Sequence, residues 1–133
     1  GSTVLEIGTG SGYQAAVLAE ISSKVFTIEI VEPLATAAER RLQRLGYDNV
    51  SVRFGDGNFG WPEAAPFDGI IVTAGGRLPP SLLEQLKPGG RMVIPINQSD
   101  GSQELIVYSK DLAGEISQRS VLPVRFVPIT GEN

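Results

Sequence analysis

The stretch from Thr3 to Gly12, which reads TVLEIGTGSG, constrains the fold of this chain more than any other. A short apolar run is followed by three glycines at alternate positions, and a helical pattern begins at Tyr13. This order predicts a strand, a tight turn and a helix. In an open α/β sheet such a turn lies at the carboxyl edge of the strands, where these folds bind ligands. The glycines let a ligand approach the main chain, and free N–H groups at the helix start favour an anionic ligand group.

The spacing of the glycines narrows the kind of ligand. Gly8, Gly10 and Gly12 give the pattern G-x-G-x-G, whereas the dinucleotide fingerprint is G-x-G-x-x-G. A P-loop is excluded because no glycine is followed by Lys-Ser or Lys-Thr. With Glu6 in front, the pattern resembles the first motif of the class I S-adenosylmethionine-dependent methyltransferases. This stretch alone leaves a chance glycine-rich turn and a dinucleotide site open as alternatives.

Length and composition limit the classes of protein. The 133 residues predict one domain, residues 1–133. The chain has no cysteine and no histidine, so we expect no metal site and no Cys nucleophile or His base. A net charge of −4 argues against a nucleic-acid partner. No apolar run approaches the roughly 20 residues of a membrane span, and no signal peptide is visible, so we expect a cytoplasmic protein without a membrane partner.

Strand and helix patterns alternate along most of the chain. β-branched and apolar runs predict strands, helical spacing predicts the elements between them, and the last strands are separated only by short turns. Alternation implies a parallel sheet with right-handed crossovers, and the short turns imply an antiparallel edge. The sequence therefore predicts an α/β fold with a Rossmann-like methyltransferase sheet. Strands are expected at 3–7, 24–28, 50–54, 68–73, 91–96, 103–110 and 116–122, with 124–129 extending the sheet; helices are expected from 11 or 12 to about 20, over 33–45 and over 81–86.

Two acids follow predicted strands at positions suited to a nucleoside. Glu29 lies about 20 residues past the glycine turn, where an acid accepts hydrogen bonds from ribose hydroxyls. The plainer interpretation is an acid at a helix N-terminus, a role that Glu32 already fills. Asp56, between two glycines, is a candidate acceptor for an adenine amino group, and an ordinary Asx-turn is the alternative. Trp61 and Phe59 are candidates to flank the base, although a lone loop Trp is more often satellite core.

Three further candidates lie in the first strand or directly after the fourth. Glu6 is a carboxylate within an apolar strand, where an unpaired charge is costly. We expect it to accept backbone N–H bonds that brace the glycine turn, or to meet an ammonium group of the ligand. Thr73 and Ala74 follow the fourth strand beside the first, where a methyl acceptor would meet the cofactor, and a plain strand-to-helix turn is the alternative.

Beyond the glycine motif, the chain closely resembles the protein-L-isoaspartate O-methyltransferase family along nearly its whole length. Gly12-Tyr13-Gln14 and the stretch 124–128 are far more specific than the methyltransferase motif alone. The matching stretches are 4–16, 45–47, 49–50, 55–57, 60–62, 65–68, 70–74 and 124–128, which read VLEIGTGSGYQAA, LGY, NV, GDG, GWP, APFD, IIVTA and VRFVP.

The resemblance implies transfer of a methyl group from S-adenosylmethionine to the α-carboxylate of L-isoaspartyl residues in damaged proteins. The ester then collapses to a succinimide, which hydrolyses partly to normal aspartyl. A carboxylate is already a nucleophile at neutral pH, so positioning replaces a His or Cys base. The implied substrate residues are Ala74 and Val127, and no catalytic residue is assigned. The expected cofactor set is Glu6, Gly8, Thr9, Gly10, Ser11, Gly12, Glu29, Ile30, Asp56, Gly57 and Thr73.

The chain departs from the family pattern in two places. The family's region before the first strand, which helps to form the active site and covers the cofactor, is absent from this sequence. Gly75-Gly76-Arg77 stands where the family usually continues with Ala or Pro. We expect the missing region to leave sheet surface uncovered, which favours self-association. The alternatives are therefore a shortened module that binds cofactor weakly and works by association, and a class I methyltransferase with another acceptor.

Overall fold

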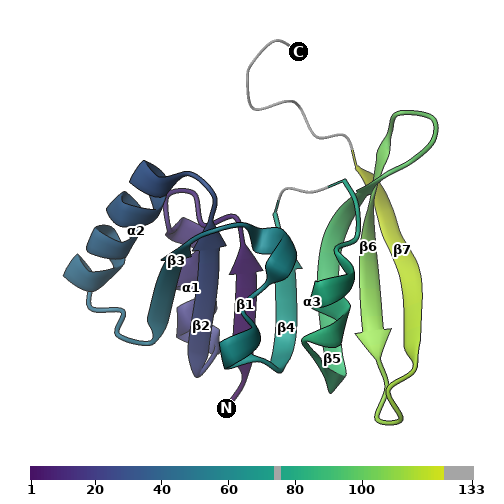
Figure 1. Ribbon diagram of the computed structural model, residues 1–133, viewed down its shortest axis with the longest axis horizontal. Coiled ribbons are helices and arrows are strands. Elements are labelled where there is room, and N and C mark those ends of the chain that lie inside the picture. The colour runs from purple at the N-terminus through teal and green to yellow at the C-terminus, as the bar shows by residue number, and fades with distance from the viewer. Residues whose placement is uncertain (74–75, 125–133) are drawn as a thin grey trace.

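The computed structural model describes residues 1–73 and 76–124, with side chains described as far as Val121. Its centre is a seven-stranded sheet in the order β3-β2-β1-β4-β5-β6-β7 (Figure 1). The pairs from β3 to β5 are parallel, and β5–β6 and β6–β7 are antiparallel. The strands are β1 (Thr3–Ile7), β2 (Lys24–Glu29), β3 (Val50–Phe54), β4 (Phe67–Val72), β5 (Leu86–Asn97), β6 (Gln103–Lys110) and β7 (Ile116–Val124).

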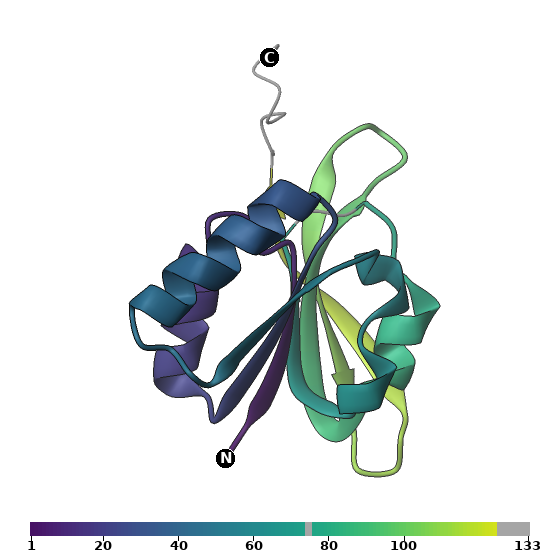
Figure 2. The same ribbon diagram turned by 60° about the vertical axis from the view of Figure 1, so that its left-hand side comes forward.

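Helices cover both faces of the parallel part of the sheet. The helices α1 (Tyr13–Ile21) and α2 (Glu32–Arg44) lie on one face. The short helix α3 (Pro80–Glu84) and the 3₁₀ turns η1 (Gly57–Phe59) and η2 (Pro62–Ala64) lie on the other, as Figure 2 shows. Each face has its own apolar core. Ala15, Leu18 and Leu42 pack on Val4 and Val25 on the α1 side, and Leu5, Phe67, Ile70, Leu82 and Ile94 belong to the α3 side.

The strand order explains where a ligand site can form. The chain runs outward from β1 to β3 and then returns to the other side of β1 as β4. Connections that diverge from a central strand leave a crevice at the carboxyl ends of the strands. The segments after β1, β2, β3 and β4 all emerge at this edge. The predicted mostly parallel sheet with an antiparallel C-terminal edge is confirmed.

Two predicted boundaries need correction. The strand expected over 91–96 starts earlier, because β5 begins at Leu86, pairs with β4 at Phe67–Leu86 and then shifts register before Gly69–Arg91. The helix predicted over 81–86 is shorter, because β5 begins at Leu86. The strand expected over 124–129 is described only at Val124, the last residue of β7; the rest lies outside the described residues. No helix in 1–73 or 76–124 is both long and apolar enough to span a bilayer.

Candidate functional site

Four strand ends meet at one cavity of about 460 Å³ at the carboxyl edge of the sheet. Gly8 and Gly10 follow β1, Glu29 ends β2, Asp56 follows β3 and Thr73 follows β4. Residues far apart in the sequence therefore share one wall. A cavity of this volume is of the size that binds a nucleoside-sized ligand. Its lining consists of Ile7, Gly8, Gly10, Ile28, Glu29, Ile30, Val31, Leu34, Asp56, Gly57, Asn58 and Thr73.

The glycine turn has a backbone path that requires glycine. The φ angles are +102° at Gly8, +55° at Gly10 and +90° at Gly12. A Cβ atom at Gly8 would lie 2.2 Å from the hydroxyl oxygen of Thr73. The Gly8 N–H donates to the carbonyl of Ile28 at 2.8 Å, which ties the turn to the end of β2. The turn thus exposes main chain to the cavity where any side chain would be strained or would collide.

Glu29 connects the glycine turn to the start of α2. Its Oε1 accepts the Gly10 N–H at 2.8 Å, and its Oε2 accepts the Val31 N–H at 3.1 Å. The residue is only 7% exposed, yet it lines the cavity. Each carboxylate oxygen keeps acceptor capacity beyond one bond. Two such oxygens, held in place by backbone donors, suit the adjacent hydroxyl groups of a ribose.

Glu6 does not accept the backbone N–H bonds that the sequence offered as one of its two roles. It is fully buried and does not line the cavity. Its Oε1 accepts the Thr27 hydroxyl at 2.7 Å instead of backbone N–H groups, and Oε2 has no partner among the described residues. Thr27 lies directly opposite on β2 and is 2.6 Å, oxygen to oxygen, from the Thr9 hydroxyl. Glu6 therefore braces the turn only through two hydroxyl groups, and contact with a ligand ammonium stays a prediction.

Burial raises the pKa of Glu6 to about 7 from an ordinary value of 4.5, against the opposing effect of the Thr27 hydrogen bond and with a further upward contribution from Glu29. The folded chain holds this proton more tightly than the unfolded chain does. Proton binding to Glu6 therefore stabilises the folded state; this contribution is fully present below about pH 4.5 and is lost as the pH rises to about 7.

We predict that the Glu6→Gln variant gains stability relative to the unchanged chain as the pH rises from about 4.5 to about 7. The relative gain should approach about 3 kcal/mol, because each unit of pKa shift corresponds to about 1.4 kcal/mol. Urea unfolding followed at several pH values measures this difference. Glu39→Gln, on the exposed side of α2, controls for the loss of one negative charge. If the free energies of unfolding of Glu6→Gln and the unchanged chain differed by the same amount at every pH, the raised pKa of Glu6 would be contradicted.

Asp56 and Gly57 form the β3 side of the cavity. Asp56 Oδ1 accepts the Asn58 N–H at 2.9 Å and so caps η1, the Asx-turn that the sequence offered as the alternative. This bond uses one carboxylate oxygen, and Oδ2 is available to a ligand. A Cβ atom at Gly57 would lie 2.3 Å from a methyl carbon of Ile7. Glycine therefore lets this backbone pack closely on β1, and capping and ligand binding are compatible.

The two aromatic candidates do not flank the cavity. The Trp61 ring packs edge-on against Phe26 at 4.9 Å between centroids, and the Arg53 guanidinium lies 4.0 Å from the Trp61 centroid. This confirms the satellite-core interpretation of Trp61. Phe59 is exposed and lines a separate hollow of about 400 Å³, which shares Ile28 and Asp56 with the main cavity.

The other candidates support the turn or lie elsewhere. Thr9 is buried, and Gly12 packs against Leu42 of α2. The Ser11 carbonyl accepts a bond from the Arg41 side chain. None of the three lines the cavity. The substrate candidates Ala74 and Val127 lie outside the described residues.

Thr73 joins the end of β4 to the glycine turn. Its hydroxyl lies 2.9 Å from the Ile7 carbonyl and 3.3 Å from the Gly8 carbonyl, and its N–H also donates to Ile7. The residue therefore fixes the wall where the β1 and β4 ends meet. No group of three or more His, Cys, Asp or Glu in the described parts of the chain is placed to hold a metal ion.

Sequence reasoning missed five residues of the cavity wall. Ile7 and Ile28 looked like ordinary strand core, and Asn58 looked like part of a loop. Val31 and Leu34 carried a usable signal, because they are large apolar residues at the N-terminal end of a helix whose buried face is formed by Ala35, Ala38 and Leu42. Both are about half exposed in the structure, as a ligand-facing apolar surface would be.

Comparison with known sequences identifies similar proteins. A family model described as Protein-L-isoaspartate(D-aspartate) O-methyltransferase (PCMT) matches residues 1–133. Protein-L-isoaspartate O-methyltransferase 2 of Syntrophobacter fumaroxidans is 61% identical over 131 residues, which are 98% of this chain and 53% of that protein. Protein-L-isoaspartate O-methyltransferase 1 of Nitrosospira multiformis is 60% identical over 129 residues, which are 96% and 55% of the two chains. The chain thus spans about half the length of these curated relatives.

Solved structures show the same fold. A protein-L-isoaspartate O-methyltransferase superposes with a TM-score of 0.88 at 36% identity, covering 96% of this chain and 41% of the other. A beta-aspartate methyltransferase (PCMT) from Plasmodium falciparum, in complex with S-adenosyl-L-homocysteine, superposes with a TM-score of 0.73 at 27% identity, covering 95% and 64%. These likenesses confirm the predicted class of fold and the family resemblance.

Proposed function

The chain belongs to the protein-L-isoaspartate(D-aspartate) O-methyltransferase family, and we propose that it forms the S-adenosylmethionine-binding domain of an enzyme that methylates L-isoaspartyl carboxylates. The observation that carries the proposal is the convergence of four strand ends on one cavity of about 460 Å³. The complex of the Plasmodium falciparum relative with S-adenosyl-L-homocysteine supports it. The acceptors are isoaspartyl-containing proteins or peptides.

The wall of the cavity offers a suitable partner for each part of such a cofactor. Glu29 presents two oriented oxygens to the ribose hydroxyls. Asp56 and the Gly57 backbone suit the edge of the adenine. Gly8 and Gly10 present exposed main chain to the amino-acid end. The apolar side chains of Ile30, Val31 and Leu34 complete the surface against which a base can pack.

The proposed chemistry needs little beyond positioning. When bound, the cofactor supplies an electrophilic methyl group on a sulfonium. The acceptor carboxylate is ionised at neutral pH, so the reaction does not require a histidine or cysteine base, and this sequence has neither residue. Thr73 marks the side of the cavity from which the acceptor approaches, and Ala74 and Val127 stay proposed substrate contacts.

We predict that this chain alone binds S-adenosylhomocysteine in isothermal titration calorimetry. A methyl-transfer assay on an isoaspartyl peptide then tests the activity, with the matched aspartyl peptide as control. The same assay is run on a longer chain that includes the further residues found in the relatives. A chain that binds the cofactor but transfers a methyl group only in this longer form would separate binding from turnover. Absence of binding at millimolar S-adenosylhomocysteine would contradict the proposal. Transfer to the aspartyl peptide at an equal rate would point to another acceptor.

Self-association is a second candidate property, and an edge strand favours it. Residues 116–121 of β7 are exposed, and β7 is the last strand of the described sheet. An edge strand presents unpaired N–H and C=O groups to which a second copy can add. Sedimentation velocity should then show a dimer that Val121→Lys weakens. A monomer at all concentrations would contradict self-association and leave the methyltransferase proposal untouched.

A further inference from the structure

The end of the cavity proposed to bind the adenine base is formed by a loop with little regular structure. Residues 55–66 connect β3 to β4 and contain only η1 and η2. Asp56 and Gly57 begin this loop, and both line the cavity. Their position therefore depends on what holds the rest of the loop.

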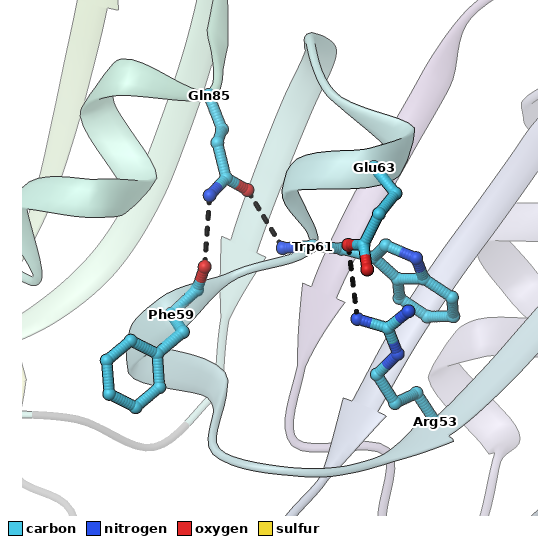
Figure 3. Close-up of polar contacts among 5 residues, drawn as sticks. All are labelled: Arg53, Phe59, Trp61, Glu63 and Gln85. Carbon is cyan, nitrogen blue, oxygen red and sulfur yellow. Dashed lines mark hydrogen bonds and ion pairs between the residues drawn. The ribbon is translucent and has the colours of Figure 1, made fainter.

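One side chain from outside the loop holds it at two points. The Gln85 Nε2 donates to the backbone carbonyl of Phe59 at 3.0 Å, and the backbone N–H of Trp61 donates to the Gln85 Oε1 at 2.9 Å (Figure 3). The Gln85 backbone carbonyl also accepts the Phe67 N–H at 2.8 Å, where the loop enters β4. Gln85 directly follows α3 and is only 8% exposed. A single residue thus secures the middle and the end of the loop.

Gly60 lies between Phe59 and Trp61, the two residues bonded to Gln85, and lets the backbone pass close to the Gln85 side chain. Its φ is +62°, and a Cβ atom there would lie 2.3 Å from the Gln85 Oε1. The amide therefore occupies the space that a side chain at this position would need. The close fit indicates that the loop path and the Gln85 side chain are matched to each other.

We propose that Gln85 is a positioning residue for adenine recognition: through Phe59 and Trp61 it sets the place of Asp56 and Gly57. The inference rests on the proposed cofactor site. A glutamine suits the task because its amide donates and accepts at once. Methionine keeps a similar shape without either bond, and glutamate keeps the acceptor but loses the donor. In each case a backbone group of the loop that now makes a partly buried hydrogen bond is left without its partner.

The loop carries its own spectroscopic reporter. Trp61 is the only tryptophan of the chain. Its ring is held between the Arg53 guanidinium and Phe26, and Arg53 also pairs with Glu63 of the same loop at 3.5 Å (Figure 3). If the backbone N–H of Trp61 loses its bond to Gln85, the ring should move and its fluorescence emission should change. Trp61 fluorescence therefore follows the loop without any measurement of activity.

The test compares Gln85→Met with the unchanged chain in calorimetric binding of two ligands. S-Adenosylhomocysteine carries the adenine amino group, and S-inosylhomocysteine replaces it with an oxygen but keeps the ribose and the tail. We expect the unchanged chain to prefer the first ligand roughly tenfold, which is the worth of about one good hydrogen bond. Gln85→Met should reduce this preference by about threefold or more and should shift Trp61 emission to longer wavelength.

Ile106→Val in β6 is the matched control, because it removes buried volume from the same apolar core without touching the loop. It should lower stability and leave both the ligand preference and the Trp61 emission unchanged. If Gln85→Met does not fold, Gln85→Glu takes its place. An unchanged preference in a folded Gln85 variant would overturn this inference alone. Absence of S-adenosylhomocysteine binding to the unchanged chain would overturn the proposed function together with it.

Discussion

Glu29→Ala should weaken binding of S-adenosylhomocysteine by about 1–3 kcal/mol, because it removes the charge-assisted hydrogen bonds that we propose Glu29 makes to the ribose. The structure adds a second reason for a large effect. The Glu29 carboxylate also holds the N–H groups of Gly10 and Val31, so its loss releases the glycine turn and the start of α2. Isothermal titration calorimetry measures the change. An affinity within a factor of about two of the unchanged chain would refute the ribose assignment.

Glu32→Ala is the matched control for this prediction. Glu32 lies in the first turn of the same helix and carries the same charge, but it is exposed and does not line the cavity. It therefore reports the effect of removing one nearby negative charge on ligand binding, without the loss of the hydrogen bonds. We expect Glu32→Ala to change affinity by a few tenths of a kcal/mol, as exposed charges do. Equal effects of the two variants would mean that Glu29 acts only through the field of its charge.

The sequence could predict the cavity because its main residues are covalent neighbours of strand ends. Gly8, Glu29, Asp56 and Thr73 each follow an apolar or β-branched run, and parallel strands bring their carboxyl ends to one edge. Strand alternation and helical spacing are local properties of the chain. A local pattern therefore suffices to place these residues together, although not to fix their hydrogen bonds.

Contacts across the sheet lay beyond sequence reasoning. The partner of Glu6 is Thr27, which depends on the register between β1 and β2. A shift of one residue would turn every side chain of a strand to the other face, and no pattern in either strand fixes the register to that accuracy. The hydrogen bonds of Gln85 to the loop after β3 likewise join distant residues: Phe59 is 26 positions away and Trp61 is 24 positions away. The same limit hid the start of β5, where the strand continues through a glycine-rich stretch while its pairing with β4 shifts register.

Together these contacts show a site supported from both faces of the sheet. Under α1, the hydroxyl groups of Thr27 and Thr9 link Glu6 to the glycine turn. On the α3 side, Gln85 holds the loop that carries Asp56. The cavity wall is thus made from turns that buried and partly buried polar contacts keep in place. Changes beneath the wall should therefore affect the site as strongly as changes on it.

Gly8→Ala is expected to destabilise the chain by about 2–4 kcal/mol, from strain at φ +102° and from the contact of the new Cβ with the Thr73 hydroxyl. The hydroxyl can move aside only by giving up its bonds to the carbonyls of Ile7 and Gly8. Gly10→Ala is the matched control, since φ is +55° and nothing lies within 4 Å of its Cβ. It should cost only about 1–2 kcal/mol, the ordinary penalty of a left-handed residue. Urea unfolding measures both changes.

A double variant separates the collision from the backbone strain. Thr73→Ala removes the hydroxyl that the Cβ of Gly8→Ala would meet at 2.2 Å and leaves the next atom at 3.6 Å, an ordinary contact distance. The combined variant should therefore lose about 1 kcal/mol less than the sum of the two single losses, as interacting neighbours do. Gly10→Ala combined with Thr73→Ala should instead be additive. Additivity for Gly8 as well would show that strain alone requires glycine there, and that Thr73 does not shape the turn.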